Sequence, residues 1–152
     1  MDRLVPVHAA DYLVAVTIAT EVPPRPTDVF TADMIDPAIR AVCEVIHNRT
    51  ADPHFPDSPV AVVLQPKAFS ADCKQDYWFR AVAGSWLPRH VARCYDTWME
   101  SSVKPWTPLV RGAVYYFSPV NMNPRGAEPK WMKGLEEVVF PAVSNWYFRW
   151  FR

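Results

Sequence analysis

The pattern of apolar and polar positions predicts a chain of short helices. Residues 9–20 form a nearly continuous apolar run, which predicts a buried helix, and the prolines after it predict where this helix ends. Residues 36–50 carry apolar side chains at helical spacing and therefore predict a second helix. Asp36 is expected to cap that helix, with Pro37 in its first turn.

The rest of the chain predicts further helices and a small amount of sheet. Residues 61–70 fit a short helix or a strand equally well, because Pro66 ends an apolar run. Residues 111–120 have the composition of a strand. Residues 131–152 are too apolar for a disordered end and are expected to pack on the body. Two more helices are expected, over residues 75–86 and 89–101.

Composition narrows the class of protein. A chain of 152 residues that is 50% hydrophobic fits one globular domain with a real core. Together with the elements above, this predicts a mainly helical α+β fold in which residues 1–152 form a single domain. The 16 basic residues equal the 16 acidic ones, so charge gives no argument for binding nucleic acid or an anionic membrane.

Cysteine and histidine give no sign of a metal or a cofactor. Cys43, Cys73 and Cys94 are odd in number and widely spaced, which argues against a disulfide framework or a zinc site. The histidines show no metal-binding motif, and no glycine-rich phosphate loop is present. Cys43 and His47 are one helical turn apart, but Cys43 belongs to the apolar stripe of its helix, whereas a cysteine nucleophile must be exposed.

The first residues give an expectation about location. No signal peptide is recognisable, and the apolar residues 12–19 are too few to span a bilayer. The chain is therefore expected to be made in the cytoplasm without stable membrane insertion. If it acts outside the cytoplasm, another agent must release it.

Glu21 is the first candidate for chemistry. It ends the first predicted helix among apolar neighbours, just before Pro23 and Pro24. The C-terminus of a helix is unfavourable for a negative charge, and partial burial there favours the protonated form of a carboxyl group. A protonated carboxyl is what general-acid cleavage of a glycosidic bond requires. A surface glutamate at a helix end would explain the same position and stays open as the alternative.

Several later motifs stand in a fixed order after Glu21. They are Asn48-Arg49, Phe55-Pro56, Gln65-Pro66 with Phe69-Ser70, GAVYYFSP from Gly112 to Pro119, Trp131, and NWYF from Asn145 to Phe148. In this order and spacing the chain resembles the spore-cortex-lytic type of cell wall hydrolase (SleB-like), over residues 12–149. Two departures stand out. The family usually follows its glutamate with Ala-Arg-Gly-Glu, where this chain has Val22-Pro23-Pro24-Arg25, and the histidine of the family's Asn-His element is Trp146 here.

The resemblance implies a lysozyme-like fold and a lytic transglycosylase that cleaves the β-1,4 bond between N-acetylmuramic acid and N-acetylglucosamine. It implies Glu21 as the acid and base, and peptidoglycan glycan strands as the partner. Tyr115 and Tyr116 are catalytic candidates, because one of two consecutive strand residues should face the groove. The substrate-binding candidates are Asn48, Gln65, Phe69, Ser70, Trp131 and Asn145. Packing or loop capping explains the two tyrosines, Asn48, Gln65, Phe69 and Ser70 equally and stays open for them.

Two other functions remain open at this point. The first is a hydrolysing muramidase in which Asp28, Asp33 or Asp36 activates water as a second carboxylate. The second is a non-catalytic wall-binding or virion structural protein on the same fold. The missing export signal and wall-anchoring domain suggest a bacteriophage lysis or virion-associated protein, with other phage proteins as further partners.

Overall fold

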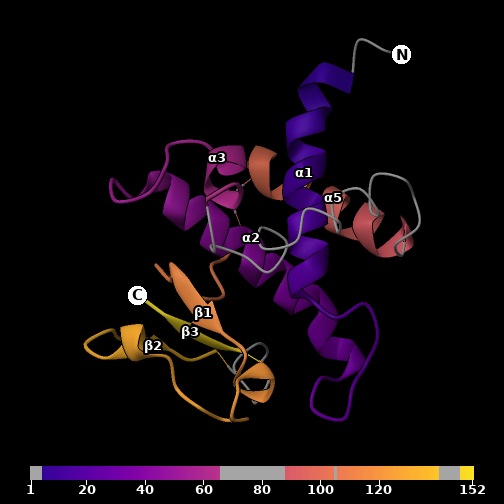
Figure 1. Cartoon of the computed structure of the whole chain (residues 1–152). Helices are drawn as coiled ribbons and strands as arrows, with labels where there is room; N and C mark the ends of the chain where they lie inside the picture. The colour runs from indigo at the N-terminus through magenta and orange to yellow at the C-terminus, as the bar shows by residue number, and fades with distance from the viewer. Residues whose placement is uncertain (1–4, 66–87, 105, 141–147) are drawn as a thin grey trace.

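The computed structural model describes residues 5–65, 88–104, 106–140 and 148–152 (Figure 1). Its helices are α1 (Val5–Glu21), α2 (Ile35–Ala51), α3 (Pro59–Val63) and α5 (Pro88–Val103), and its strands are β1 (Tyr115–Phe117), β2 (Glu137–Val138) and β3 (Arg149–Phe151). Short 3₁₀ turns occur at Ala32–Met34, Pro119–Asn121 and Lys130–Met132. The helix expected over residues 75–86 lies outside the described residues, as do Phe69, Ser70 and Asn145. Where elements are described, the predicted α+β class is confirmed.

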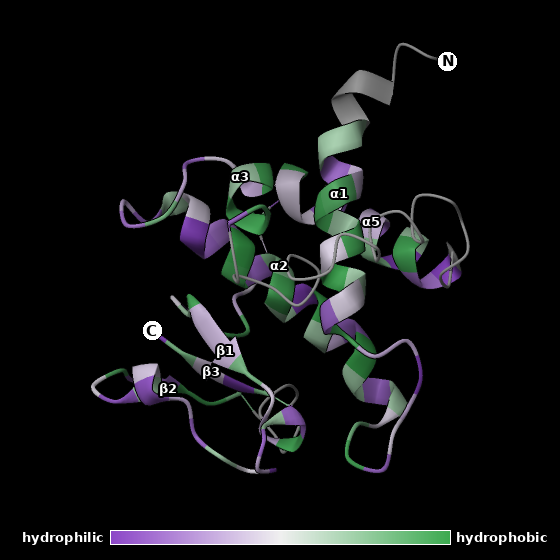
Figure 2. Ribbon diagram, viewed as in Figure 1, coloured by the Kyte–Doolittle hydropathy of each residue, from purple (hydrophilic) through white to green (hydrophobic). Residues whose placement is uncertain are grey.

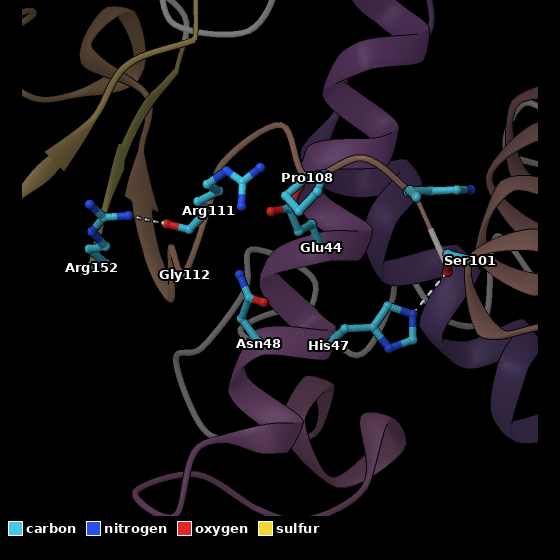
Figure 3. Close-up of a pocket in the computed structure, with 9 residues that line it drawn as sticks. Glu44, His47, Asn48, Ser101, Pro108, Arg111, Gly112 and Arg152 are labelled. Atoms are coloured by element: carbon cyan, nitrogen blue, oxygen red, sulfur yellow. Dashed lines mark hydrogen bonds between the residues drawn. The ribbon is translucent and has the colours of Figure 1, made fainter. Parts of the chain in front are cut away.

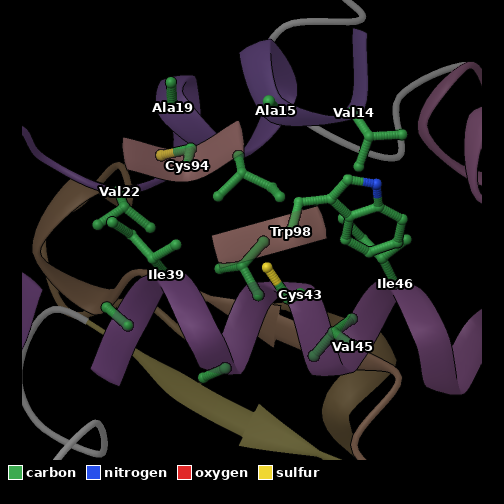
Figure 4. Close-up of a cluster of buried hydrophobic side chains, with 14 of the residues drawn as sticks. Val14, Ala15, Ala19, Val22, Ile39, Cys43, Val45, Ile46, Cys94 and Trp98 are labelled. Carbon is green, nitrogen blue, oxygen red and sulfur yellow. The ribbon is translucent and has the colours of Figure 1, made fainter. Parts of the chain in front are cut away.

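The helical part is organised around α1. Every residue from Val14 to Ala19 is buried, because α1 packs against α5, α2 and α3 on different sides. Figure 4 shows side chains of α1, α2 and α5 pointing toward one another, with Trp98 and Cys43 among them. Trp98 is buried and donates its Nε1–H to Asp11 at 2.8 Å, so its polar atom is satisfied. A helix that is apolar on all sides is expected in such a position, and green dominates α1 in Figure 2.

The sheet is small and is completed by the end of the chain. Its order is β1-β3-β2 and both pairings are antiparallel, with Tyr116 opposite Trp150. Tyr116 and Trp150 pack toward the helical core, while Phe117 and Phe151 stack on the opposite face at 6.0 Å. The described part of the C-terminal segment therefore packs on the body, as its apolar composition predicted.

Two predictions about local structure are decided by the coordinates. Residues 59–63 form a helix, α3, whose first turn is capped by the Ser58 hydroxyl, which accepts a hydrogen bond from the Ala61 N–H at 3.3 Å. The prediction that Asp36 caps α2 is wrong. The preceding 3₁₀ turn runs straight into α2, which begins at Ile35, and Asp36 lies within the first turn. Its carboxylate instead pairs with Arg93 of α5 at 3.0 Å.

Cys43 and Cys94 are buried free thiols, as their positions predicted. Burial raises the pKa of Cys94 to about 12 and raises the pKa of Cys43 well above its ordinary value. Neither thiol is therefore a nucleophile near neutral pH. None of the described helices is long and apolar enough to cross a membrane.

Candidate active site

Glu21 lies at the last position of α1 and reaches across to the sheet. The hydroxyl group of Tyr116 in β1 donates a hydrogen bond to Glu21 Oε1 at 2.5 Å. The Tyr116 ring is held between Trp150, at 5.0 Å between centroids, and Phe148, at 5.8 Å. Strand alternation predicted that one of the two tyrosines would face the candidate acid, and that tyrosine is Tyr116.

The prolines after Glu21 explain why α1 ends there. Pro23 and Pro24 have no N–H, so they cannot donate to the carbonyls four residues earlier in the helix. The last regular bond runs from Val22 N to Ile18 O at 3.1 Å. The carbonyl of Val22 then accepts a hydrogen bond from Nε2 of His90 in α5 at 2.8 Å. The helix end that carries Glu21 is thus held by a side chain from another helix.

Arg49 is a buried cation beside the same group. It is 6% exposed, and its Nε donates to the Val114 carbonyl at 2.7 Å, just before β1. Burial lowers the pKa of Arg49, while the nearby Tyr116, Tyr115 and Glu21 act in the opposite direction. Sequence reasoning used Arg49 only as part of a motif. Its position one turn after the apolar Val45 and Ile46, on the buried side of α2, was the available signal.

A second tyrosine and two other rings form an aromatic shelf, defined here as Phe55, Tyr115 and Trp131. The Tyr115 ring lies 5.9 Å from Phe55 and 5.3 Å from Trp131, and Trp131 is 42% exposed. The Arg49 guanidinium lies 5.2 Å from the Phe55 ring and 5.8 Å from the Tyr115 ring. Arg49 therefore adjoins both the shelf and the Glu21–Tyr116 pair. The structure brings Trp131 to Tyr115 as a partly exposed ring.

Asn48 does not join this group. Its Nδ2 donates to the Ala113 carbonyl at 2.9 Å, and it lines a separate cavity of about 460 Å³ next to α2 (Figure 3). The alternative that Asn48 caps its own helix is not seen either, since its amide bonds the segment before β1. Gln65 lies just after α3, and no contact joins it to Glu21 within the described residues. Phe69, Ser70 and Asn145 are outside the described residues.

The cavity in Figure 3 is built from polar groups that hold the fold together. Glu44 accepts hydrogen bonds from the backbone N–H groups of Leu109, at 2.7 Å, and Val110, at 3.1 Å. His47 bonds the Ser101 hydroxyl at 2.9 Å, and burial lowers the pKa of His47. Because these groups already have protein partners, the cavity is a joint between α2, α5 and the segment before β1.

Other kinds of site find little support in the described part of the chain. It contains no group of three or more His, Cys, Asp or Glu side chains that could hold a metal ion. The Cys43–His47 pair is not a catalytic dyad, because His47 bonds Ser101 and burial disfavours the Cys43 thiolate. Asp28 and Asp33 are exposed on the loop after α1, and Asp33 accepts a hydrogen bond from the Thr31 hydroxyl.

Comparisons with known proteins agree with this architecture. Residues 36–148 match the Cell Wall Hydrolase family, a match that begins after Glu21. The fold is similar to the catalytic domain of the germination-specific lytic transglycosylase SleB from Bacillus anthracis, with a TM-score of 0.61 and 19% identity over 94% of this chain and 93% of that one. It is also similar to the catalytic domain of the Bacillus cereus SleB protein, with a TM-score of 0.55 and 19% identity over 95% and 91%.

No curated protein sequence matches the chain. The family match nevertheless covers most of it, and the structural likeness extends over the helix that carries Glu21 as well. The chain belongs to the cell wall hydrolase family and is a peptidoglycan-degrading enzyme.

Proposed function

We propose that the chain is a lytic transglycosylase that cleaves the β-1,4 bond between N-acetylmuramic acid and N-acetylglucosamine, with Glu21 as its acid and base. The observation that carries this proposal is the hydrogen bond from the Tyr116 hydroxyl to Glu21 Oε1. It shows a carboxyl group oriented at the end of a helix by a residue from the sheet, beside the buried cation Arg49. A surface glutamate would not need such a contact.

The proposed reaction uses one carboxyl group twice. Glu21 first gives its proton to the glycosidic oxygen as the bond from that oxygen to the muramyl C1 breaks. The resulting carboxylate then takes the proton of the muramyl 6-hydroxyl, whose oxygen bonds to C1 and closes a 1,6-anhydro ring. Tyr116 fixes the direction of the carboxyl group, and the charge of Arg49 stabilises the carboxylate formed between the two steps.

The aromatic shelf would supply a binding surface for the glycan strand. Sugar rings have apolar faces, and the partly exposed Trp131 with Tyr115 and Phe55 offers a matching apolar surface. Arg49 touches both this shelf and the acid, so a ring bound there would lie close to Glu21. Asn48 and Gln65 have no part in this proposal, because neither contacts the acid or the shelf within the described residues.

The test is the chemical structure of the released products. Purified peptidoglycan sacculi are digested, and the muropeptides are analysed by mass spectrometry before and after borohydride reduction. The proposal expects products with 1,6-anhydromuramic acid ends, one water lighter than hydrolysis products and resistant to reduction. Reducible muramic acid ends as the main product would instead show a hydrolysing muramidase.

A matched pair of variants tests the role of Glu21. Glu21→Gln keeps the size of the side chain but cannot donate and retake the proton, so we expect a folded protein with at least about a hundredfold less activity. Glu100→Gln, an exposed position on α5, is the control and should retain activity. Clearing of sacculi by folded Glu21→Gln at the wild-type rate would rule out Glu21 as the acid.

A further inference from the structure

His90 meets the end of α1 at the residue that follows Glu21. Its ring is 6% exposed, and its Nε2 lies 2.8 Å from the Val22 carbonyl oxygen. The carbonyl can only accept, so the ring donates from Nε2. The bond joins residues 68 positions apart and links α5 to the last turn of α1.

The sequence after α1 makes this outside donor necessary. In a continuing helix, the Val22 carbonyl would accept from the N–H of residue 26, but residue 26 is a proline. Pro23 removes the donor for Ala19 in the same way. Val22 is 1% exposed, so a missing partner for its carbonyl is not readily replaced by water. His90 supplies the N–H that the prolines take away.

The orientation of that carbonyl bears directly on Glu21. The Val22 N–H is bonded to Ile18 O at 3.1 Å, and the Val22 carbonyl is bonded to His90, so both ends of the residue after Glu21 are fixed. The side chain of Glu21 is held from the opposite direction by Tyr116. Backbone and carboxyl group are therefore anchored by two different elements, α5 and β1.

We propose that His90 is a positioning residue for Glu21, which sets the geometry of the acid through the Val22 carbonyl and touches neither substrate nor reacting atoms. The inference rests on the proposed function of Glu21. A second observation supports it: Nδ1 of His90 is buried without a hydrogen-bond partner among the described residues. A buried ring nitrogen without a partner is unfavourable, so a residue that only fills space would be better apolar. The donating Nε2 is what the histidine adds.

The test compares two substitutions that differ in the ability to donate. His90→Gln keeps an N–H that can reach the Val22 carbonyl, whereas His90→Leu fills similar space without one. We expect His90→Leu to lower kcat on soluble glycan strands about tenfold or more, with KM and binding to sacculi nearly unchanged, because small displacements of a catalytic group reduce rate. His90→Gln should recover most of kcat. His54→Leu, at a side chain that is 88% exposed, is the control and should have wild-type kcat.

A second measurement does not depend on activity. Hydrogen exchange of the Val22 amide should be faster in His90→Leu than in wild type and should return toward the wild-type rate in His90→Gln. If His90→Leu does not fold, His90→Met replaces it as the variant without an N–H. Wild-type kcat or wild-type Val22 exchange in the folded Leu or Met variant would overturn the proposal, as would equal losses in the Gln variant. Activity retained by Glu21→Gln would instead overturn the proposed function, while the exchange result would still report on the His90 contact.

Discussion

The Tyr116 hydroxyl donates a 2.5 Å hydrogen bond to Oε1 of Glu21, a contact between residues 95 positions apart. Because the Tyr116 ring is packed against Phe148 and Trp150, the hydroxyl has little freedom to turn away. The bond ties the end of α1 to β1, and the direction of the Glu21 carboxyl group therefore depends on how the sheet packs against the helices.

The two neighbouring tyrosines should respond differently to loss of the hydroxyl group. Tyr116→Phe removes a hydrogen bond to the carboxyl group, which corresponds to about 1.5–3 kcal/mol if the carboxyl is charged, so we expect activity to fall roughly tenfold or more. Tyr115→Phe keeps the ring that contacts Phe55 and Trp131 and should have a much smaller effect. The measurement is the rate of clearing of sacculi, compared with the unfolding midpoint of each variant. Equal effects of the two substitutions would contradict an orienting role for Tyr116.

Arg49 should matter for stability as well as for activity. Arg49→Met keeps much of the aliphatic length but leaves the Val114 carbonyl without its donor. We expect the free energy of unfolding to fall by about 1–3 kcal/mol, the typical cost of a buried unsatisfied polar group. Activity should fall further than this loss explains, because the cation next to Glu21 is gone. Urea unfolding together with sacculus clearing checks both parts, and a fully stable, fully active variant would contradict them.

Sequence reasoning succeeded where the deciding interactions are local. The apolar run before Pro23 predicted α1 and the place where it ends, since proline removes a backbone donor wherever it stands. The apolar composition of the last residues predicted that they pack on the body. The same reasoning failed for Asp36, because the 3₁₀ turn before α2 and the distant Arg93 decide where its carboxylate goes.

The partners of the candidate acid could not be predicted in the same way. Arg49 and His90 act on the end of α1 from α2 and α5, so their roles depend on how three helices pack. The sequence shows an arginine and a histidine in partly apolar helices, and such residues are as often paired for structural reasons. Asn48 illustrates the converse, since it sits beside Arg49 in sequence but points to the Ala113 carbonyl and lines another cavity.

The acids on the loop after α1 should be dispensable if Glu21 acts alone. Asp28 and Asp33 are exposed, and Asp33 accepts a hydrogen bond from the Thr31 hydroxyl instead of facing Glu21. We therefore expect Asp28→Asn and Asp33→Asn each to keep most of the wild-type activity and the same anhydro products. A folded variant of either residue that loses activity would favour a hydrolase with a second carboxylate.

Two buried histidines should make the protein less stable as the pH falls toward 5. Burial lowers the pKa of His47 and of His90 below the ordinary value of 6.5, so the unfolded chain takes up protons at a higher pH than the folded chain does. The free energy of unfolding should therefore be at its full value above pH 6.5 and should decline from there down to the folded-state pKa of each histidine.

Paired acids also act on stability, but in a lower pH range. Hydrogen bonds from Arg152 and Arg149 hold the pKa of Glu136 and of Glu137 below the ordinary value of 4.5, so their contribution is lost only when the pH falls below about that value. Urea unfolding between about pH 5 and pH 7.5 thus isolates the histidines. We expect His47→Gln and His90→Gln each to flatten the slope in this range, because glutamine does not titrate. His54→Gln, at an exposed side chain, should leave the slope as it is. A slope that persists unchanged in both buried variants would mean that other groups cause it.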